Sequence, residues 1–230
     1  MDIKKEYERW LVNATADTDV ADELKTLDDT KIEDAFYRDL AFGTGGLRGV
    51  IGAGTNRMNV YTVAKASQGL ADYLKKNFTE PSVAIGYDSR IKSDVFAKVA
   101  AGVFAANGVK VNIWPTLMPV PTVSFATRYL HTSAGVMVTA SHNPSKYNGY
   151  KVYGADGCQI TTEAAAEILA EISMQKDRRS LHGCRRCLGK ELLLPSMADT
   201  ACRRILSNFW QIMLTCLRTL FLHSEYPQER

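Results

Sequence analysis

Residues 134–151 read AGVMVTASHNPSKYNGYK, and this stretch decides the predicted fold. Its beginning, residues 134–138, is a continuous apolar run with the length of a buried strand. Ser, Asn and Pro then dominate a polar turn, and Asn148-Gly149 is a turn signal from which residues 150–153 can run back beside the first strand. The stretch therefore predicts a buried strand followed by a polar loop that presents the hydroxyl of Ser141.

The segments before this stretch alternate between helical and extended patterns. The expected elements are a helix at 60–78 with Asn59 as its N-cap, a strand at 82–87, a helix with Ser93 as N-cap that ends before Gly108, a strand at 109–114 and a helix at 120–130. Continuous apolar strands separated by helices indicate an α/β fold. We expect three layers, α/β/α, with a mixed, mostly parallel sheet and helices on both of its faces.

Helical patterns also flank this alternating region. Residues 1–40 place apolar side chains at helical spacing around an Asp- and Thr-rich turn, and a last helix begins at Thr161 or Thr162 and runs to about residue 173. Between the first helices and the alternating region we expect a glycine-dense loop, residues 42–49 (FGTGGLRG).

Composition excludes several classes of protein. The 230 residues are 46% hydrophobic and 23% charged, as in an ordinary globular protein. No apolar run reaches the about 18 residues of a membrane-spanning helix, and residues 1–6 lack the apolar segment of a signal peptide. The net charge of +3 is too small to indicate nucleic acid or an anionic membrane. We therefore expect a cytoplasmic protein that binds neither nucleic acid nor membrane.

The composition changes near residue 175. Residues 1–175 contain 18 Lys and Arg against 20 Asp and Glu, whereas residues 176–230 contain 10 against 5. The preferred cation changes from Lys to Arg at the same point, and four of the five cysteines lie beyond it: Cys184, Cys187, Cys202 and Cys216. The sequence thus predicts a helical lead at 1–40, an α/β/α domain at 41–174 and a basic, Cys- and Arg-rich tail at 175–230.

Two explanations of this tail remain open. A shift of reading frame near residue 174 would produce such an unselected composition, and a specialised segment with a binding role is the alternative. Residues 202–223 are apolar at helical spacing, but no strand pattern accompanies them. The pair Cys184 and Cys187 lacks a second pair at a suitable distance, so we expect no zinc site there.

The loop around Ser141 allows two interpretations. Composition alone favours an ordinary turn, because Ser, Asn and Pro dominate turns for backbone reasons. In an open α/β sheet, however, ligands bind at the carboxyl ends of the strands, where this loop lies. Residues 139–151 resemble the active-site serine loop of the α-D-phosphohexomutase family, with its Thr-x-Ser-His-Asn-Pro core and the following Tyr-Asn-Gly-x-Lys. Residues 43–49 (GTGGLRG) and 86–90 (GYDSR) match two further motifs of that family in type and order.

The resemblance covers roughly residues 40–173, and the helical lead fits the phosphoglucomutase and phosphopentomutase branch. It implies the N-terminal domain I of an enzyme that interconverts sugar 1-phosphate and 6-phosphate. In this family a phosphoserine donates its phosphoryl group to the sugar phosphate, and the resulting bisphosphate turns over and returns the other group. The implied site residues are catalytic Ser141, Lys151 and Arg48, and phosphate-binding Arg90, His142 and Asn143.

Residue types alone leave simpler interpretations of the same positions. Lys151 would be a solvated lysine at a strand end, and Arg48 would belong to a plain glycine-rich turn. Arg90 with Asp88 would be a surface ion pair. Cys158 is expected to be a small buried hydrophobe.

The resemblance also implies Mg²⁺, and glucose 1,6-bisphosphate as intermediate and activator. In the family, a phosphoserine oxygen and three aspartates of an Asp-x-Asp-x-Asp-Arg loop in the next domain hold the metal, and oxygen ligands of this kind suit a hard cation. The sequence contains no such loop, and Asp17-Thr18-Asp19 is the nearest string. Ser141 is therefore the one expected ligand.

The resemblance places the loops that recognise the sugar and bind its phosphate in the third and fourth domains, and we expect one of four domains to be present, with domains II–IV missing. We therefore expect the isolated chain to be inactive or nearly so. Glucose phosphate is favoured as the substrate, with phosphopentose and mannose phosphate as alternatives. A non-catalytic phosphosugar-binding or interaction module derived from the same fold is the second functional hypothesis, and complementation with the missing domains distinguishes the two.

Overall fold

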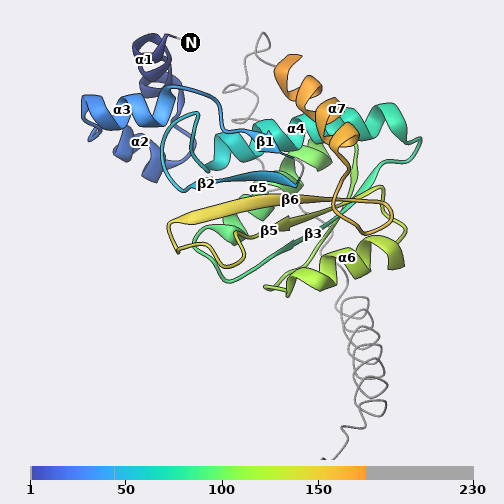
Figure 1. Ribbon diagram of the computed structural model, residues 1–230. Helices are drawn as coiled ribbons and strands as arrows, with labels where there is room; N and C mark the ends of the chain where they lie inside the picture. Colours follow the sequence, from blue (N-terminus) through green and yellow to red (C-terminus); the bar gives the residue numbers. More distant parts are fainter. Residues whose placement is uncertain (1, 44, 175–230) are drawn as a thin grey trace, which may run out of the picture.

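The computed structural model of the chain describes residues 2–43 and 45–174. The predicted tail at 175–230, with its apolar segment 202–223 and its four cysteines, lies outside these residues. Figure 1 shows the described part as a central sheet with helices around it. None of its helices is both long and apolar enough to span a membrane.

Helices come first in the chain, and strands and helices then alternate. The helices are α1 (Ile3–Asn13), α2 (Thr18–Leu24), α3 (Asp29–Phe36), α4 (Val60–Asn77), α5 (Ser93–Ala106), α6 (Val120–Tyr129) and α7 (Thr162–Met174). The strands are β1 (Phe42–Gly43), β2 (Gly46–Val50), β3 (Ser82–Tyr87), β4 (Lys110–Ile113), β5 (Ala134–Val138) and β6 (Tyr147–Gly154).

The strands form one mixed sheet in the order β1-β2-β6-β5-β3-β4. On one side, β5, β3 and β4 pair in parallel, joined by the crossover helices α5 and α6. On the other side, β6 is antiparallel to both β5 and β2, and β1 is antiparallel to β2. The sheet is mixed, as expected, but parallel pairing is confined to the β5–β3–β4 side. A short connection such as the β5–β6 loop can join only antiparallel neighbours, which explains why β6 does not continue the parallel pairing.

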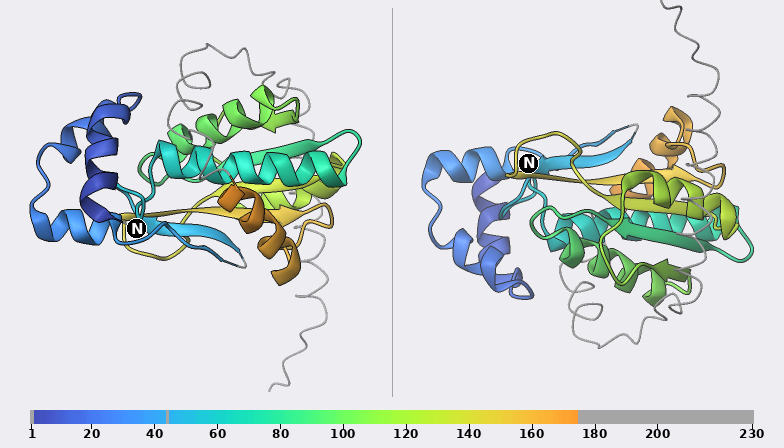
Figure 2. Two further views of the ribbon diagram at one scale, coloured as in Figure 1. Left: turned by 90° about the horizontal axis from the view of Figure 1, so that it is seen from above. Right: turned by 90° about the horizontal axis from the view of Figure 1, so that it is seen from below.

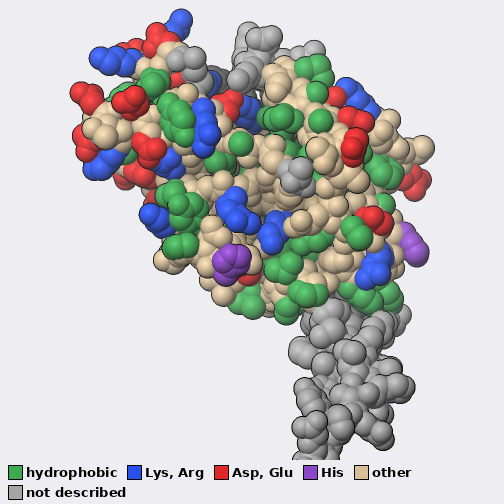
Figure 3. Space-filling view, in the orientation of Figure 1, with side chains coloured by type: hydrophobic (Ala, Val, Ile, Leu, Met, Phe, Trp, Pro, Cys, Tyr) green, Lys and Arg blue, Asp and Glu red, His purple; other side chains and the backbone are tan. Residues whose placement is uncertain are grey.

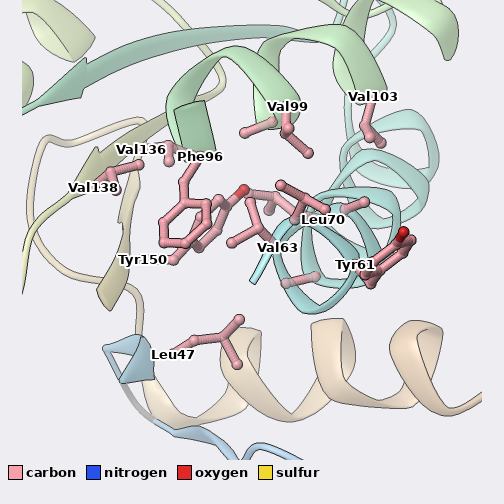
Figure 4. Packing of buried hydrophobic residues seen from close by; sticks show 14 of the residues in the cluster. Leu47, Tyr61, Val63, Leu70, Phe96, Val99, Val103, Val136, Val138 and Tyr150 are labelled. Atoms are coloured by element: carbon pink, nitrogen blue, oxygen red, sulfur yellow. The ribbon is translucent and has the colours of Figure 1, made fainter. Parts of the chain in front are cut away.

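Helices cover both faces of the sheet, as predicted (Figures 1 and 2). Side chains alternate between the faces of a strand. Val136 and Val138 of β5 therefore face the cluster built by α4 and α5, while Met137 faces the cluster of α6. Figure 4 shows Tyr150 of β6 within the first cluster, among residues of α4 and α5. Each fully buried side chain of this size contributes about 1.5–3 kcal/mol to folding.

The N-terminal ends of α4 and α5 differ in how they are capped. Asn59 caps α4, because its Oδ1 accepts hydrogen bonds from the N–H groups of Tyr61 and Thr62, which confirms the predicted cap. The predicted cap Ser93 is wrong. The N-cap of α5 is Lys92, at φ 60°, and it makes no side-chain capping bond. The hydroxyl of Ser93 is unavailable because it donates to Asp88 Oδ1 at 2.8 Å.

The glycine-dense segment contains two strands, β1 and β2, where the sequence predicts a loop. Gly46 lies so close to β6 that a Cβ would stand 1.9 Å from the carbonyl oxygen of Tyr150. Glycine removes the apolar alternation by which a strand is recognised, and it permits this close approach of two backbones. β2 thereby joins the sheet beside β6 and places Arg48 opposite Gly149.

The first three helices share the core of the sheet domain. The ring of Trp10 meets those of Phe36 and Tyr61 edge-on, with centroids 5.7 and 5.3 Å apart. Ala53 N–H donates to Glu23 Oε2 at 2.9 Å, and Lys92 Nζ lies 2.8 Å from Asp19 Oδ2. The helices are therefore fastened to α4, to the segment after β2 and to the start of α5.

Candidate active site

Ser141 lies in an exposed loop just beyond the carboxyl end of β5. Its φ is 57°, in the left-handed region, which costs a residue other than glycine about 1–2 kcal/mol. Its N–H donates to Oγ1 of the buried Thr139 at 3.0 Å. Strain of this kind persists only where surrounding contacts enforce it.

Arg90 supplies many of those contacts from the loop after β3. Its Nη1 donates to the carbonyl oxygens of Pro144 and Tyr147, each at 3.2 Å. Its Nη2 donates to the carbonyl of Asn143 at 2.6 Å and also to the carbonyl of Ser141. The guanidinium thus lies inside the serine loop and bonds to its backbone.

Asp88 connects the β3 loop to the same segment. Its Oδ2 accepts from Thr139 Oγ1 at 2.6 Å, and its Oδ1 accepts from the N–H of Arg90 at 3.0 Å. Arg90 Nε lies 3.7 Å from Asp88 Oδ2, so the two residues form the ion pair that their residue types predict. Both side chains are mostly buried, however, and both also bind other groups. The ends of β3 and β5 are therefore held together by a carboxylate between them.

The far end of the serine loop is fastened at Asn148. Its Nδ2 donates to the carbonyl of Ile91 and to Ser93 Oγ, both at 3.0 Å, and its Oδ1 accepts from the N–H of Gly149 at 2.8 Å. Asn148 is fully buried, so these bonds are shielded from water. Both ends of the loop are consequently tied to the segment between β3 and α5.

Arg48 and Lys151 project from the same face of neighbouring strands. Arg48 lies opposite Gly149, and Lys151 lies opposite Gly46, in the ladder between β2 and β6. Residues opposite one another, or two apart on one strand, share a face. Lys151 also lies opposite Met137, which packs against α6, so this is the α6 side of the sheet. Figure 3 shows Lys and Arg side chains and a His gathered on that face.

Two contacts relate the remaining predicted residues to the loop. Arg48 Nη1 donates to Asn143 Oδ1 at 3.4 Å, and His142 Nδ1 lies 3.4 Å from Ser141 Oγ. The structure thus brings five of the six predicted residues together around one loop. Lys151 stands on the same face, with no hydrogen-bond or ion-pair partner for its ammonium among the described residues.

The described residues do not make a metal site. Within residues 2–43 and 45–174, no three side chains of His, Cys, Asp or Glu come together as ligands would. Asp17 and Asp19 are engaged elsewhere, because Asp17 caps α2 and both carboxylates face Lys92.

A shallow pocket of about 370 Å³ lies beside the loop, at the carboxyl end of β3. Its lining residues are Tyr87, Asp88, Ser89, Arg90, Asp94, Thr116 and Leu117. Ser141 is not among them, and its side chain is exposed outside this pocket.

The prediction of a buried Cys158 is wrong. Cys158 is exposed in the turn that follows β6, and its N–H donates to Asp156 Oδ1 at 2.9 Å. The turn keeps this side chain out of the core, and the residue type alone does not indicate that Cys158 lies in a turn.

The residues that hold the loop were only partly visible in the sequence. Asp88 was recognisable as an orienting partner of Arg90, but Thr139, Ser93 and Asn148 carry no predicted role in the site. Their signal was the match of the whole segment 139–151 to one motif, which contains Thr139 and Asn148 without saying what they bind.

Comparison with known proteins agrees with this arrangement. Residues 39–179 match the family model of phosphoglucomutase/phosphomannomutase, alpha/beta/alpha domain I. The chain is 45% identical over 141 residues to a phosphoglucomutase of Staphylococcus haemolyticus, covering 61% of the chain and 26% of that relative. It is 48% identical over 129 residues to a phosphoglucomutase of Staphylococcus epidermidis, covering 56% and 24%.

A solved structure from Thermus thermophilus, assigned as a phosphomannomutase, is 35% identical and superposes with a TM-score of 0.55 over 59% of this chain and 30% of that one. The chain spans about a quarter of the length of the curated relatives it matches. Over the sheet and the serine loop, sequence and structure agree with one family, and the chain belongs to the phosphoglucomutase/phosphomannomutase family as a carrier of its α/β/α domain I.

Proposed function

We propose that this chain is the N-terminal catalytic domain of a phosphoglucomutase-like enzyme and that Ser141 carries the phosphoryl group. One observation supports this most directly. Ser141 is an exposed hydroxyl held in a left-handed conformation at the carboxyl end of β5, with Arg48 beside its loop. Such a hydroxyl is accessible to a substrate, and the nearby cation favours an anion there.

The proposed reaction exchanges one phosphorus–oxygen bond for another. A sugar hydroxyl oxygen bonds to the phosphorus on Ser141 while the bond from phosphorus to Oγ breaks, and a base takes the sugar hydroxyl proton while Oγ receives a proton and becomes a hydroxyl. In the second half, Oγ of Ser141 takes the other phosphoryl group from the sugar bisphosphate and gives up this proton, and the sugar oxygen receives a proton and is left as a hydroxyl. Splitting the migration into two direct transfers is the advantage of a covalent carrier.

Positive charge and positioning dominate catalysis of phosphoryl transfer. We assign Arg48 to charge stabilisation, because its guanidinium already reaches the serine loop at Asn143. Lys151 is the candidate for proton transfer and phosphate contact, since its ammonium is uncommitted among the described residues and shares a face with Arg48. His142 and Asn143 are proposed to contact the phosphate and shape the loop.

The substrate, metal and partners follow from the family. Phosphoglucomutases of this family are metal-dependent, and we propose Mg²⁺, with glucose 1,6-bisphosphate as intermediate and glucose phosphate as substrate. The described residues offer the metal a single ligand, so domains II–IV are the required partners. We also propose the division into a lead at 1–40, domain I at 41–174 and a separate tail from 175.

Mass spectrometry of phosphopeptides tests the assignment of Ser141. Protein isolated from cells, or treated with glucose 1,6-bisphosphate in the presence of a separately supplied domain II–IV fragment of a staphylococcal relative, should carry phosphate on Ser141. Ser141→Ala should remove it, while Ser145→Ala, in the same exposed loop, should not. Phosphate on Ser145 or Ser89 with none on Ser141 would overturn the proposal.

A second candidate is a phosphosugar-binding module without catalysis. It is favoured by the two cations Arg48 and Lys151 on one face of the sheet, which suit an anionic sugar phosphate whether or not a transfer follows. Restored mutase activity on mixing with the missing domains supports the enzyme domain. Binding of glucose phosphate by the chain, with no activity in the mixture, supports the module.

A further inference from the structure

The guanidinium of Arg90 faces groups of the protein itself on all sides. A guanidinium carries five N–H donors in a fixed plane. Four of them serve the carbonyl oxygens of Ser141, Asn143, Pro144 and Tyr147, and the fifth, on Nε, faces the carboxylate of Asp88. An arginine that binds phosphate needs at least one free edge, which this side chain lacks.

The contacts of Arg90 and Thr139 fix the backbone of Ser141 on both sides. The Ser141 carbonyl accepts from Arg90, and the Ser141 N–H donates to Thr139 Oγ1 at 3.0 Å. Thr139 is oriented in turn, because its hydroxyl donates to Asp88 Oδ2 at 2.6 Å. With both peptide groups held, the dihedral angles of Ser141 cannot relax out of the left-handed region.

We propose that Arg90 is a positioning residue, which together with Asp88 and Thr139 holds Ser141 in its left-handed conformation and does not bind the substrate phosphate. The functional meaning of this inference rests on the proposed role of Ser141 as the phosphoryl carrier. The contacts that fix the backbone of Ser141 are present without phosphate. Its consequence is that the nucleophile is aimed before any substrate or further domain arrives.

The substitution Arg90→Lys separates the two roles. Lysine keeps the positive charge that a phosphate would need, but it cannot reproduce the planar fork that reaches four carbonyls. A matched control is Arg57→Lys. The side chains of Arg57 and Arg90 are both 16% exposed, and Arg57 also donates to backbone carbonyls, of Asp34 and Asn56, away from the serine loop.

The measurement uses the full unphosphorylated chain, so its result does not depend on whether Ser141 becomes phosphorylated in the cell. Amide hydrogen exchange and the ¹³Cα shift of Ser141 report its hydrogen bond and its backbone angle. Trypsin cleavage after the exposed Lys146 reports the loop as a whole. We expect Arg90→Lys to speed both exchange and cleavage by about tenfold or more, as the loss of such bonds implies, and Arg57→Lys to change neither.

Thr139 provides a second, independent pair of variants. Thr139→Val removes the acceptor of the Ser141 N–H and should speed its exchange, whereas Thr139→Ser keeps the hydroxyl and should preserve slow exchange. The proposal is overturned if Arg90→Lys leaves the Ser141 signals and cleavage unchanged, or if Arg57→Lys alters them equally. Equal exchange in Thr139→Val and Thr139→Ser would also overturn it.

Discussion

The carbonyl oxygen of Thr139 lies against the Cα of Gly149, at a distance that leaves no room for a side chain. A Cβ on Gly149 would stand 2.6 Å from that oxygen and 3.0 Å from the carbonyl oxygen of Leu47. Thr139 N–H also donates to the carbonyl of Gly149 at 3.0 Å. The backbone of Thr139, the first residue of the serine loop, thus packs directly against Gly149 of β6, and Leu47 of β2 packs against the same glycine.

Gly149→Ala should therefore destabilise the chain. The added methyl meets backbone atoms that cannot rotate away, and overpacking of this kind costs about 1–3 kcal/mol of unfolding free energy. Urea unfolding followed by circular dichroism measures the loss. At Gly43 the nearest atom to an added Cβ lies 4.0 Å away, so Gly43→Ala should stay within about 0.5 kcal/mol of the unchanged chain. Equal effects at both positions would contradict the crowding argument.

Ser141→Gly should unfold at higher denaturant concentration than Ser141→Ala. Both variants lose the hydroxyl, but only glycine adopts φ 57° without strain. After subtraction of the larger backbone entropy that glycine loses on folding, the free energy of unfolding of Ser141→Gly should exceed that of Ser141→Ala by about 1 kcal/mol. Because neither variant can carry phosphate, the comparison isolates backbone strain. Identical midpoints would mean that the strain at Ser141 is relieved in solution.

Tyr150 should make the chain sensitive to alkaline pH. Burial raises the pKa of its phenol above the ordinary value of 10.0, while its hydrogen bond to Ser67 opposes the shift. The unfolded chain loses this proton near pH 10 and the folded chain keeps it, so the stability it provides is complete below pH 10. Above that pH it falls by about 1.4 kcal/mol per unit.

Tyr150→Phe should reduce this slope and cost about 1–2 kcal/mol at neutral pH, because Ser67 Oγ, 3.1 Å from the phenol, loses its partner. Burial raises the pKa of Tyr153 as well, so part of the slope should remain. Ser67→Ala, which keeps the phenol, should retain the full slope. Urea unfolding between pH 8 and about pH 11 checks all three; an unchanged slope in Tyr150→Phe would refute the assignment.

Phe36→Ala should weaken the whole described domain and not only the first helices. Phe36 is fully buried against Tyr7 and Trp10, and losing such a ring costs about 3–5 kcal/mol. Tryptophan fluorescence and circular dichroism should report one shared transition at a lower urea concentration. Tyr37→Ala, at the adjacent and 45% exposed position, should change little. An early separate transition of the helices would show that the lead folds independently.

Mg²⁺ should bind the chain only weakly. A hard cation needs several oxygen ligands, and the described residues bring no three ligating side chains together. Titration calorimetry should show no site tighter than millimolar, and EDTA should leave the melting temperature unchanged. A tight site that survives in Ser141→Ala would reveal a carboxylate cluster elsewhere in the chain.

Elements with local signals could be predicted closely from the sequence. The predicted helix at 60–78 is α4 at Val60–Asn77, since its cap and its apolar stripe are both local. The strands β3 and β5 were visible as continuous apolar runs. β2 was not, because it is rich in glycine and is stabilised by β6, far away in the sequence.

The residues of the candidate site could be singled out from the sequence, but their contacts could not. The motif around Ser141 identifies the loop, and two separate motifs, at 43–49 and 86–90, single out Arg48 and Arg90. The partners of Arg90 are backbone carbonyl groups. Because every residue has such a group, the residue types do not indicate which carbonyls accept from Arg90. A sequence can therefore name Arg90 as part of the site while leaving open whether it faces a ligand or the loop.

The pairing of Arg48 with Gly149 joins strands that lie far apart along the chain. On the ribosome, β2 emerges early and finds no central neighbour until β6 has been synthesised, because β1 is its only other partner among the described strands of the sheet. Contacts between such distant segments form late and slowly. The face that carries Arg48 and Lys151 is thus completed last, when β6 pairs with β2, and a nascent chain has no assembled candidate site until then.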